Sequence, residues 1–356
     1  MLFDPRPKDS REDLYDRERE VDALVESGLP LILLLGRRRI GKSSVLRVAL
    51  REVGGVYLDA RLLYAESGGW IPTRLFIEAL ADALGEARGR LRRGLERAVR
   101  HVEGVTVAGI RLNLSREPAL RELLGALEAA GATIGVDEAQ YLRYSGARGG
   151  RELLALFAYI YDNLQGVRLI LSGSEVGLLH DFLGLDDYRS PLYGRPYRAV
   201  TLAPFTRRQS LEFLERGFAE RGLQPPRETL EAAVAELDGV PGWLVDFGLA
   251  YLSHGSLDEA LREVYSRAEG FVKGELALLE RRSPRYAELL KAVAAGYTSW
   301  ESLRRYMGAR GVRSTSTLSR LLRGLEKMGW VEKRLVDGRP RYRVSDPVVE
   351  RVLRRL

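Results

Sequence analysis

Eight residues near the start of the chain, Gly36 to Ser43, combine two glycines, a lysine and a hydroxyl in the spacing G-x-x-x-x-G-K-S. Glycines at the first and sixth positions permit a tight turn in which successive backbone N–H groups point inward, toward phosphate oxygens. Lys42 adds a positive charge for the β- and γ-phosphates, and the Ser43 hydroxyl is a ligand suited to Mg²⁺. The pattern predicts a P-loop that binds a nucleoside triphosphate.

The segments on either side of this loop have the properties needed to position it. Leu31 to Leu35 is an apolar run short enough for a strand buried on both faces, and Ser44 to Val48 continues with helical spacing. Strand, glycine loop and helix in this order are the context that a P-loop requires, and the helix adds the positive end of its dipole. A chance match on a glycine-containing loop is the alternative, and the context argues against it. The residues expected to bind nucleotide here are Gly36, Arg38, Arg39, Ile40, Gly41, Lys42, Ser43 and Ser44.

A second candidate site begins at the end of another strand that is predicted to be buried. Thr133 to Val136 is followed directly by Asp137 and Glu138. Acidic residues often end strands, so this pattern alone is weak, but it lies about 95 residues after the P-loop, where it indicates a Walker B motif. We expect Asp137 to hold Mg²⁺ through water, and Glu138 to polarise the attacking water as a general base.

Two further positions are candidates for contact with the transferring phosphate. The buried run Val167 to Ser174 ends in small polar residues, and either Ser172 or Ser174 is suited to sense the γ-phosphate or the attacking water. The alternative is an ordinary turn at the end of a strand. Arg195, in the loop before a fifth strand near Arg198 to Leu202, is the candidate arginine for stabilising charge in the transition state. The chain is rich in arginine, and most arginines are surface residues. Only the position of Arg195 favours a catalytic role over a surface role.

The segment before the P-loop strand has two open interpretations. Residues 1–12 are polar and are predicted to be loose, and Leu14 to Leu24 follows as an amphipathic helix. This helix is either a surface helix with solvated charges, or its start forms an edge that lies against the adenine. In the second case Tyr15 and Arg17 bind the cofactor.

The region between the two motifs contains a predicted insertion. Residues 73–100 are predicted to be helical, with arginine charges that are mostly solvated. Gly104 to Leu114 alternates apolar and polar residues around Ala108-Gly109, which predicts a β-hairpin. Such hairpins can carry a partner contact, but the sequence does not say which.

The C-terminal part of the chain is strongly basic. From Pro284 to Leu356 there are 17 Lys and Arg against seven Asp and Glu, a net charge of +10, whereas the whole chain has a net charge of +7. The remaining residues are therefore slightly acidic. A nearly neutral body with a basic tail indicates a polyanionic partner for the tail.

The pattern within this tail predicts a winged helix-turn-helix. Three helices are expected at Arg285–Ala295, Ser299–Met307 and Ser314–Met328, followed by a hairpin that turns at Asp337-Gly338. The third helix has leucines on one face and basic residues on the other, which suits a recognition helix, and an arginine-rich wing suits phosphates. Such a domain can instead dock on protein or inhibit its own chain. The DNA-contacting candidates are Ser316, Arg320, Arg334, Arg339 and Arg341.

The order of the motifs resembles the archaeal ATPase family, a group of P-loop ATPases within the AAA+-related STAND class. The segments that carry the resemblance lie between Leu14 and Leu252 and read LYDRERE, GRRRIGKSS, TIGVDEAQ, LILSGS, PLYGR and LAPF. The family usually has Thr where Ser43 stands, a change that keeps the hydroxyl. The resemblance implies ATP or ADP as the nucleotide and an α/β fold of the ASCE or AAA+ type. It also implies a five-stranded parallel sheet in the order 5-1-4-3-2, followed by a helical lid and a winged helix.

The resemblance further assigns a lid residue to the nucleotide. In STAND ATPases a Gly-x-Pro between two lid helices touches the bound nucleotide, and Gly239-Val240-Pro241 matches it. Without the resemblance, Pro241 predicts only a turn between two helices. The expected domains are a P-loop core (residues 1–205), a lid (206–283) and a winged helix (284–356).

Composition excludes several classes of protein. The chain has no cysteine, so disulfides and thiolate metal sites are excluded, and a cytoplasmic setting is the simpler interpretation. No apolar run approaches the length of a membrane span, and the N-terminus lacks a signal-peptide pattern, so we expect a soluble protein without a membrane partner.

Three functions remain open from the sequence. The first is a Mg²⁺-dependent ATPase switch that couples nucleotide state to the binding of double-stranded DNA. The second is a signalling ATPase with slow turnover, whose winged helix docks on a protein partner or on another copy of the chain. The third is a transcription regulator whose P-loop only stabilises the fold. The sequence does not say whether Arg195 acts in its own subunit or in a neighbour's.

Overall fold

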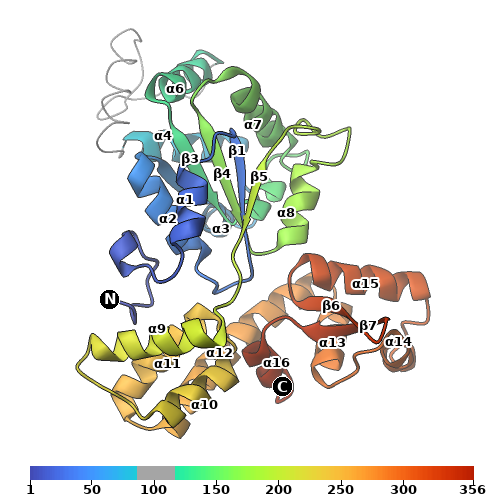
Figure 1. Cartoon of the computed structure of the whole chain (residues 1–356). Helices are drawn as coiled ribbons and strands as arrows, with labels where there is room; N and C mark the ends of the chain where they lie inside the picture. The colour runs from blue at the N-terminus through green and yellow to red at the C-terminus, as the bar shows by residue number, and fades with distance from the viewer. Residues whose placement is uncertain (86–116) are drawn as a thin grey trace. The chain divides into compact units, whose positions relative to one another are not determined.

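Two units make up the part of the chain that the computed structural model describes, residues 1–85 and 117–356. The sheet unit comprises Pro7–Leu202, and the helical unit comprises Met1–Arg6 together with Ala203–Leu356 (Figure 1). The predicted hairpin at Gly104–Leu114 lies outside the described residues, as do residues 86–100 of the predicted arginine-rich helix.

The sheet unit is built on parallel strands. The described strands are β1 (Leu31–Leu35), β2 (Val56–Asp59), β3 (Thr133–Asp137), β4 (Arg168–Gly173) and β5 (Arg198–Thr201), in the order β2-β3-β4-β1-β5. This is the strand order implied by the family resemblance, which is therefore confirmed. Because all neighbours are parallel, the carboxyl ends of the strands share one edge of the sheet, and the P-loop follows β1 there.

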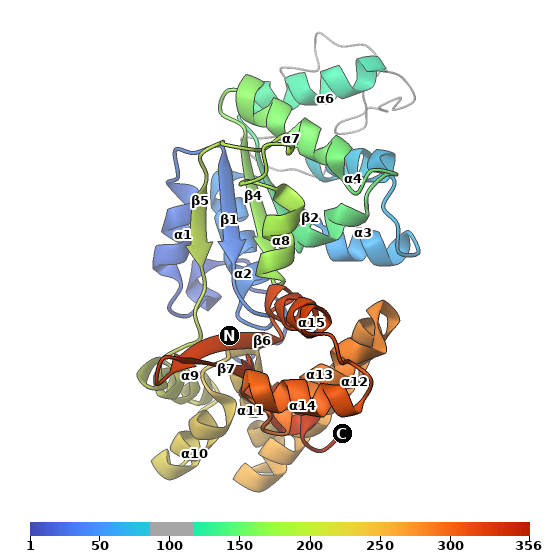
Figure 2. The same cartoon turned by 90° about the vertical axis from the view of Figure 1, so that its right-hand side faces the viewer.

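Helices cover both faces of this sheet (Figures 1 and 2). Ile32 and Leu34 of β1 pack with α1 and α2, whereas Leu31 and Leu33 belong to a second core on the opposite face. The prediction of a first strand buried on both faces is confirmed. The helices and turns of this unit are η1 (Arg11–Asp13), α1 (Glu18–Val25), α2 (Lys42–Val53), α3 (Ala60–Glu66), α4 (Thr73–Gly85), α6 (Glu117–Ala130), η2 (Ala139–Tyr144), α7 (Arg151–Asn163) and α8 (Val176–Leu183).

The helix before the P-loop strand is shorter than predicted. It begins at Glu18 and not at Leu14, because Asp16 has a φ of 50°, a left-handed conformation that an α-helix does not accept. Arg17 is the N-cap residue of α1. Residues 14–17 are therefore a loop, and the prediction of a continuous helix from Leu14 was wrong.

The helical unit continues as predicted, without a strand until residue 331. Its elements are α9 (Arg207–Ala219), α10 (Arg227–Leu237), α11 (Pro241–His254), α12 (Leu257–Arg282), α13 (Pro284–Ala294), α14 (Trp300–Ala309), α15 (Thr315–Lys327), β6 (Val331–Val336), β7 (Arg339–Val344) and α16 (Pro347–Leu353). The antiparallel ribbon β6–β7 turns at Asp337 and Gly338, which both have positive φ, so the predicted hairpin is confirmed. Gly239 and Val240 lie between α10 and α11, and α11 begins at Pro241, so the predicted turn between two helices is confirmed.

The predicted lid and tail segments are joined by specific side-chain contacts. The Trp243 indole donates a hydrogen bond to Asp346 at 2.8 Å, and Asp346 also caps α16. Arg351 donates to the Tyr265 hydroxyl at 2.6 Å, and that hydroxyl donates to Glu236 at 2.6 Å. Both segments therefore fold into a single unit.

The N-terminal residues, predicted to be loose, are packed into the helical unit. Phe3 is 2% exposed and lies edge-on to Phe218, with the ring centroids 4.9 Å apart. Its ring occupies a slot at Gly217 of α9 and Gly248 of α11, where a Cβ atom at either position would collide with it. The Leu2 backbone N–H also donates to Glu220 at 2.8 Å. The expectation of a loose N-terminus was therefore wrong for these residues.

No helix in the described ranges combines the length and the apolar character needed to cross a membrane.

Candidate nucleotide-binding site

The P-loop connects β1 to α2 at the carboxyl edge of the sheet. Gly36 has a φ of 154°, and a Cβ atom there would lie 3.0 Å from the Leu202 carbonyl oxygen. Gly41, the N-cap residue of α2, has a φ of 97°. Ile40 is buried among the residues of α1, α2 and β1, which anchors the loop to the hydrophobic core. The two glycines are needed for these backbone conformations, as the motif predicted.

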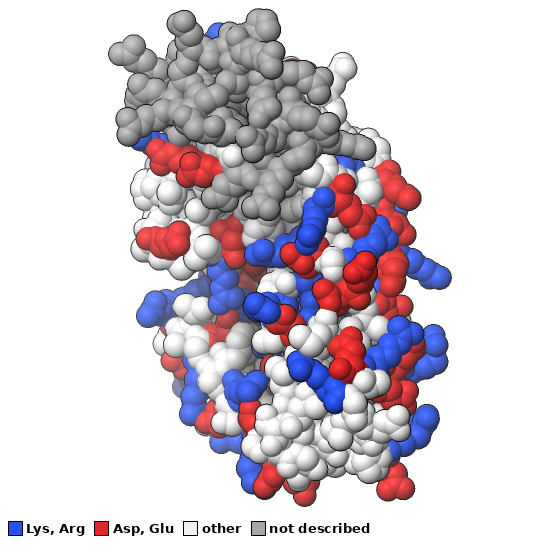
Figure 3. Space-filling view, turned by 90° about the vertical axis from the view of Figure 1, so that its left-hand side faces the viewer, with Lys and Arg blue, Asp and Glu red and all other residues white. Residues whose placement is uncertain are grey.

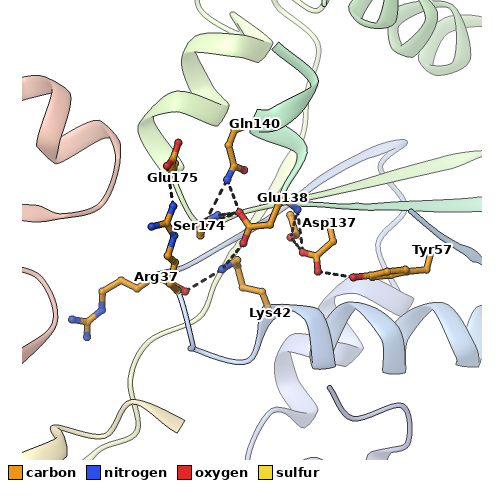
Figure 4. Close-up of polar contacts among 10 residues, drawn as sticks. Arg37, Lys42, Tyr57, Asp137, Glu138, Gln140, Ser174 and Glu175 are labelled. Atoms are coloured by element: carbon orange, nitrogen blue, oxygen red, sulfur yellow. Dashed lines mark hydrogen bonds and ion pairs between the residues drawn. The ribbon is translucent and has the colours of Figure 1, made fainter. Parts of the chain in front are cut away.

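Lys42 is buried within this loop, with its side chain 4% exposed. Its ammonium group donates to the Arg37 carbonyl oxygen at 3.0 Å and lies 3.8 Å from a carboxylate oxygen of Glu138 (Figure 4). Burial lowers the pKa of Lys42, while the carboxylates of Glu138 and Asp137 oppose that effect. A buried cation in a glycine-containing loop at the start of a helix suits a polyphosphate ligand.

The Glu138 carboxylate accepts hydrogen bonds from Ser174, which directly follows β4, and from Gln140 in η2. The Ser174 hydroxyl donates to its carboxylate at 2.6 Å and the Ser174 backbone N–H at 3.2 Å, and the Gln140 amide also donates to it. Burial opposes ionisation of this carboxyl most strongly, but the charge of Lys42 and the hydrogen bonds from Ser174 and Gln140 outweigh it and hold the pKa of Glu138 below its usual value. Glu138 is therefore ionised at neutral pH, as a base must be.

Asp137 receives a hydroxyl on each carboxylate oxygen. Tyr57 of β2 donates to Oδ2 at 2.8 Å, and Ser172 of β4 donates to Oδ1 (Figure 4). Burial, and next the negative charge of Asp137, raise the pKa of the Tyr57 hydroxyl, so it remains a donor. The guanidinium of Arg47, on α2, lies 4.0 Å from the centre of the Tyr57 ring. Sequence reasoning did not single out Tyr57.

Both serines at the end of β4 reach the acidic pair. Ser172 contacts Asp137 and accepts the Glu138 backbone N–H at 3.3 Å, and Ser174 contacts the Glu138 side chain. The structure thus brings together both candidates that the sequence left as alternatives. Which of them senses the phosphate stays a prediction.

A family model described as an ATPase domain predominantly from Archaea matches residues 14–247. The chain belongs to this family. It is also similar over 99% of its length to the whole of the Walker-type ATPase PABY2304 of Pyrococcus abyssi, with 45% identity and a TM-score of 0.88. The site therefore binds nucleotide and hydrolyses ATP. This sets aside the hypothesis of a P-loop that only stabilises the fold.

Two more distant solved structures cover nearly the whole ATPase. The Orc1 protein of Aeropyrum pernix, in complex with DNA, is 21% identical, with a TM-score of 0.46 and coverage of 96% of this chain and 92% of that one. Cdc6p of Pyrobaculum aerophilum is 17% identical, with a TM-score of 0.48 and coverage of 99% and 96%. No match was found among curated proteins.

Arg195 lies at the opposite edge of the ATPase sheet. It precedes β5, which runs parallel to β1, so the whole of β5 separates it from the carboxyl edge, about 13 Å at ~3.3 Å per residue. Its guanidinium donates to Asp162, near the end of α7, at 2.9 Å. The structure therefore does not bring Arg195 to the P-loop of its own chain, and a role in a neighbouring copy stays a prediction.

Two other predicted nucleotide ligands, Arg17 and Ser44, have partners within the protein. Arg17 is buried at the start of α1 and pairs with Glu20 at 3.3 Å, which gives it a structural contact there. The Ser44 hydroxyl accepts a hydrogen bond from the Lys8 backbone N–H at 3.0 Å. Contact of Tyr15 and Arg17 with adenine, and of Pro241 with nucleotide, stay predictions.

The five DNA-contacting candidates of the ATPase are all exposed residues of the helical unit. Ser316 and Arg320 lie on α15, and Arg334, Arg339 and Arg341 lie on the β6–β7 ribbon. Within the described residues, no acidic side chain forms an ion pair with Arg320, Arg339 or Arg341, whereas Arg334 pairs with Glu332 at 3.0 Å.

Proposed function

We propose that this protein is a Mg²⁺-dependent ATPase switch that couples its nucleotide state to the binding of double-stranded DNA. The observation that carries the DNA part is the set of exposed arginines on α15 and on the adjoining ribbon. The chain is proposed to act in the cytoplasm, with ATP and DNA as its ligands.

The residues at the end of β3 and the start of α2 fit a magnesium ion. Mg²⁺ in nucleotide sites takes oxygen ligands, usually one or two carboxylates or hydroxyls together with phosphate oxygens and water. Ser43, in the first turn of α2, supplies a hydroxyl, and Asp137 supplies a carboxylate that Tyr57 and Ser172 hold in place. When bound, the ion would neutralise charge on the β- and γ-phosphates.

Two side chains of the protein, Lys42 and Glu138, have separate roles in the proposed hydrolysis. Lys42 supplies a fixed positive charge within the loop, and the ionised carboxylate of Glu138 accepts a proton from the attacking water. The Ser174 hydroxyl and the Gln140 amide fix the direction of that carboxylate. The geometry supports Glu138 as the base, because its side chain is only 18% exposed and its carboxylate is held by three donors.

The contact between Tyr57 and Asp137 leads to a first prediction. Tyr57→Phe removes the hydroxyl and keeps the ring beneath Arg47, so only the support of Asp137 is lost. We expect the affinity for a fluorescent ADP analogue to fall about 10-fold or more in Mg²⁺ but to stay unchanged in EDTA, because partners behind a metal ligand typically affect affinity on this scale.

Tyr161→Phe is the matched control, since it also deletes a hydroxyl with a single carbonyl partner, at Pro196. An equal loss with and without Mg²⁺ in the Tyr57 variant would mean that the hydroxyl serves the fold and not the metal site.

The C-terminal elements support a winged helix. Helix α15 buries Leu318, Leu321, Leu322 and Leu325 and exposes Ser316, Arg320, Arg323 and Lys327. An exposed basic face on the third helix suits insertion into the major groove. The ribbon β6–β7 follows at once, in the place of a wing (Figure 2).

The ribbon carries like charges in direct opposition. Arg334 lies directly across from Arg341 in the β6–β7 register, an arrangement that destabilises an isolated ribbon. Phosphates of a nucleic acid would relieve this repulsion. The exposed arginines of α15 and the ribbon are therefore the candidate DNA surface. On the coloured residues of Figure 3, basic and acidic side chains are interspersed.

A second candidate function has one observation in its favour. Leu335 and Val336, at the tip of the ribbon, are 72% and 49% exposed, which suits contact with a protein partner. In that case the protein is a regulatory ATPase whose tail docks on protein or on another copy of the chain.

The experiment that tests the switch is a titration of duplex DNA against the empty, ADP-bound and ATP-analogue-bound protein at one salt concentration. We expect nucleotide to change DNA affinity by ~5–150-fold, the usual range of coupling between two sites. Pro241→Ala should shrink this difference, because a ligand shifts an equilibrium only through contacts that differ between states. Three superimposable curves would contradict the switch, and no binding at low salt would favour docking on protein.

A further inference from the structure

A buried ion pair joins the P-loop to the end of β4. The Arg38 guanidinium donates to a carboxylate oxygen of Glu175 at 3.0 Å, and Glu175 is only 3% exposed. Glu175 directly follows Ser174, the residue that holds Glu138 (Figure 4). The P-loop pattern itself requires neither Arg38 nor Glu175, since it leaves the residue at position 38 unspecified.

Two guanidinium groups lie near the Glu175 carboxylate. A buried carboxylate is costly unless it is paired, and Glu175 is paired with Arg38 and also lies 3.8 Å from the guanidinium of Arg143. These contacts hold the Arg38 guanidinium at the end of β4.

Arg38 lies four residues before Lys42 in the same loop. Its partner Glu175 lies beside Ser174, whose hydroxyl donates to Glu138 at 2.6 Å. The ion pair therefore joins the P-loop to the segment that holds Glu138.

We propose that Arg38 is a catalytic residue that contacts the γ-phosphate within its own chain, and that Glu175 is a positioning residue that holds the Arg38 guanidinium there. A guanidinium has five N–H donors in one plane, so it can hold a carboxylate and a phosphate oxygen at the same time. Arg38 thereby supplies the transition-state charge that sequence analysis assigned to Arg195. The proposal rests on ATP hydrolysis at this P-loop and is independent of DNA binding.

The test compares the full-length protein with Arg38→Ala, Arg38→Lys and Glu175→Gln. Arg38→Ala should lower kcat at least ~10²-fold, because an arginine that stabilises phosphoryl-transfer charge is worth that much or more. It should weaken binding of a non-hydrolysable ATP analogue ~10-fold and leave ADP affinity within about 3-fold. Arg38→Lys should restore little, since an ammonium lacks the fork geometry. Glu175→Gln should lower kcat ~10-fold with ADP affinity unchanged.

Arg37→Ala is the matched control, because Figure 4 shows the Arg37 side chain of the same loop pointing away from Lys42 and Glu138. Since Arg38→Ala leaves a buried carboxylate behind, the double variant Arg38→Met, Glu175→Gln is included, in which that charge is also removed. The double variant should fold. It should show the same loss of kcat and of ATP-analogue affinity as Arg38→Ala, with ADP affinity kept.

Three results would overturn the proposal. They are unchanged turnover in Arg38→Ala and the double variant, equal losses of ADP and ATP-analogue affinity, and the same kinetic loss in Arg37→Ala. Glu138→Gln is measured in parallel. If it abolishes turnover while the Arg38 variants do not, only this proposal fails, and if it too leaves turnover normal, the assignment of the hydrolytic site fails.

Discussion

We expect Glu138→Gln to lower ATP turnover at least ~10²-fold and to leave nucleotide affinity nearly unchanged. The substitution keeps the size of the side chain but removes the group that is proposed to accept the proton of the attacking water. Lys42 and the backbone of the P-loop, which carry most of the attraction for phosphates, are not altered. The measurements are single-turnover hydrolysis and titration of a fluorescent ATP analogue.

Glu66→Gln, at the exposed end of α3, is the control for a lost carboxylate elsewhere in the sheet unit. Turnover close to that of the unaltered protein in the Glu138 variant would remove Glu138 from its role as base. A large loss of affinity would instead show that its main contribution is to hold Lys42, which lies 3.8 Å away.

If the protein binds DNA as proposed, we expect reversal of Arg320, Arg339 and Arg341 to Glu to weaken binding to every duplex by at least ~10²-fold at low salt. Each lost phosphate contact reduces the slope of log affinity against log salt by about one, so the triple variant should lose about three units of slope. Fluorescence anisotropy across a series of salt concentrations measures both quantities.

A second triple variant distinguishes the effect of arginine position on DNA affinity from the effect of net charge. Arg208, Arg221 and Arg262 are exposed in the same unit but lie outside α15 and the ribbon, so their reversal changes the net charge equally. Equal losses in the two triple variants would mean that DNA responds only to total charge. If neither variant nor the unaltered protein binds DNA, the tail is a protein-docking module.

The elements of the sheet unit could be predicted because their signals are local. The apolar run Leu31–Leu35, the glycine spacing and the acidic pair at Asp137 each lie within a few consecutive residues, and the strand order followed from the family resemblance. The start of α1 was missed because the positive φ of Asp16 overrides a helical pattern that is otherwise continuous.

The residues that support the site were missed because their partners are distant in sequence. Tyr57 and Asp137 are 80 residues apart, and Arg38 and Glu175 are 137 residues apart. Neither pair has a periodicity or a spacing by which it could be recognised. Arg195 is different, because the direction of β5 already implies that a loop before a parallel strand lies at the amino edge. The parallel sheet was implied only by the family resemblance, and the prediction left open whether Arg195 acts in its own subunit or in a neighbour's.

The slot for Phe3 has a consequence for the order in which the chain folds. During synthesis residues 1–6 are made roughly 200 residues before the helices that receive Phe3, α9 and α11. The sheet unit lies wholly between them in the chain and can fold as soon as its own residues are available. The slot for Phe3 can therefore form only after all residues of the sheet unit have been made.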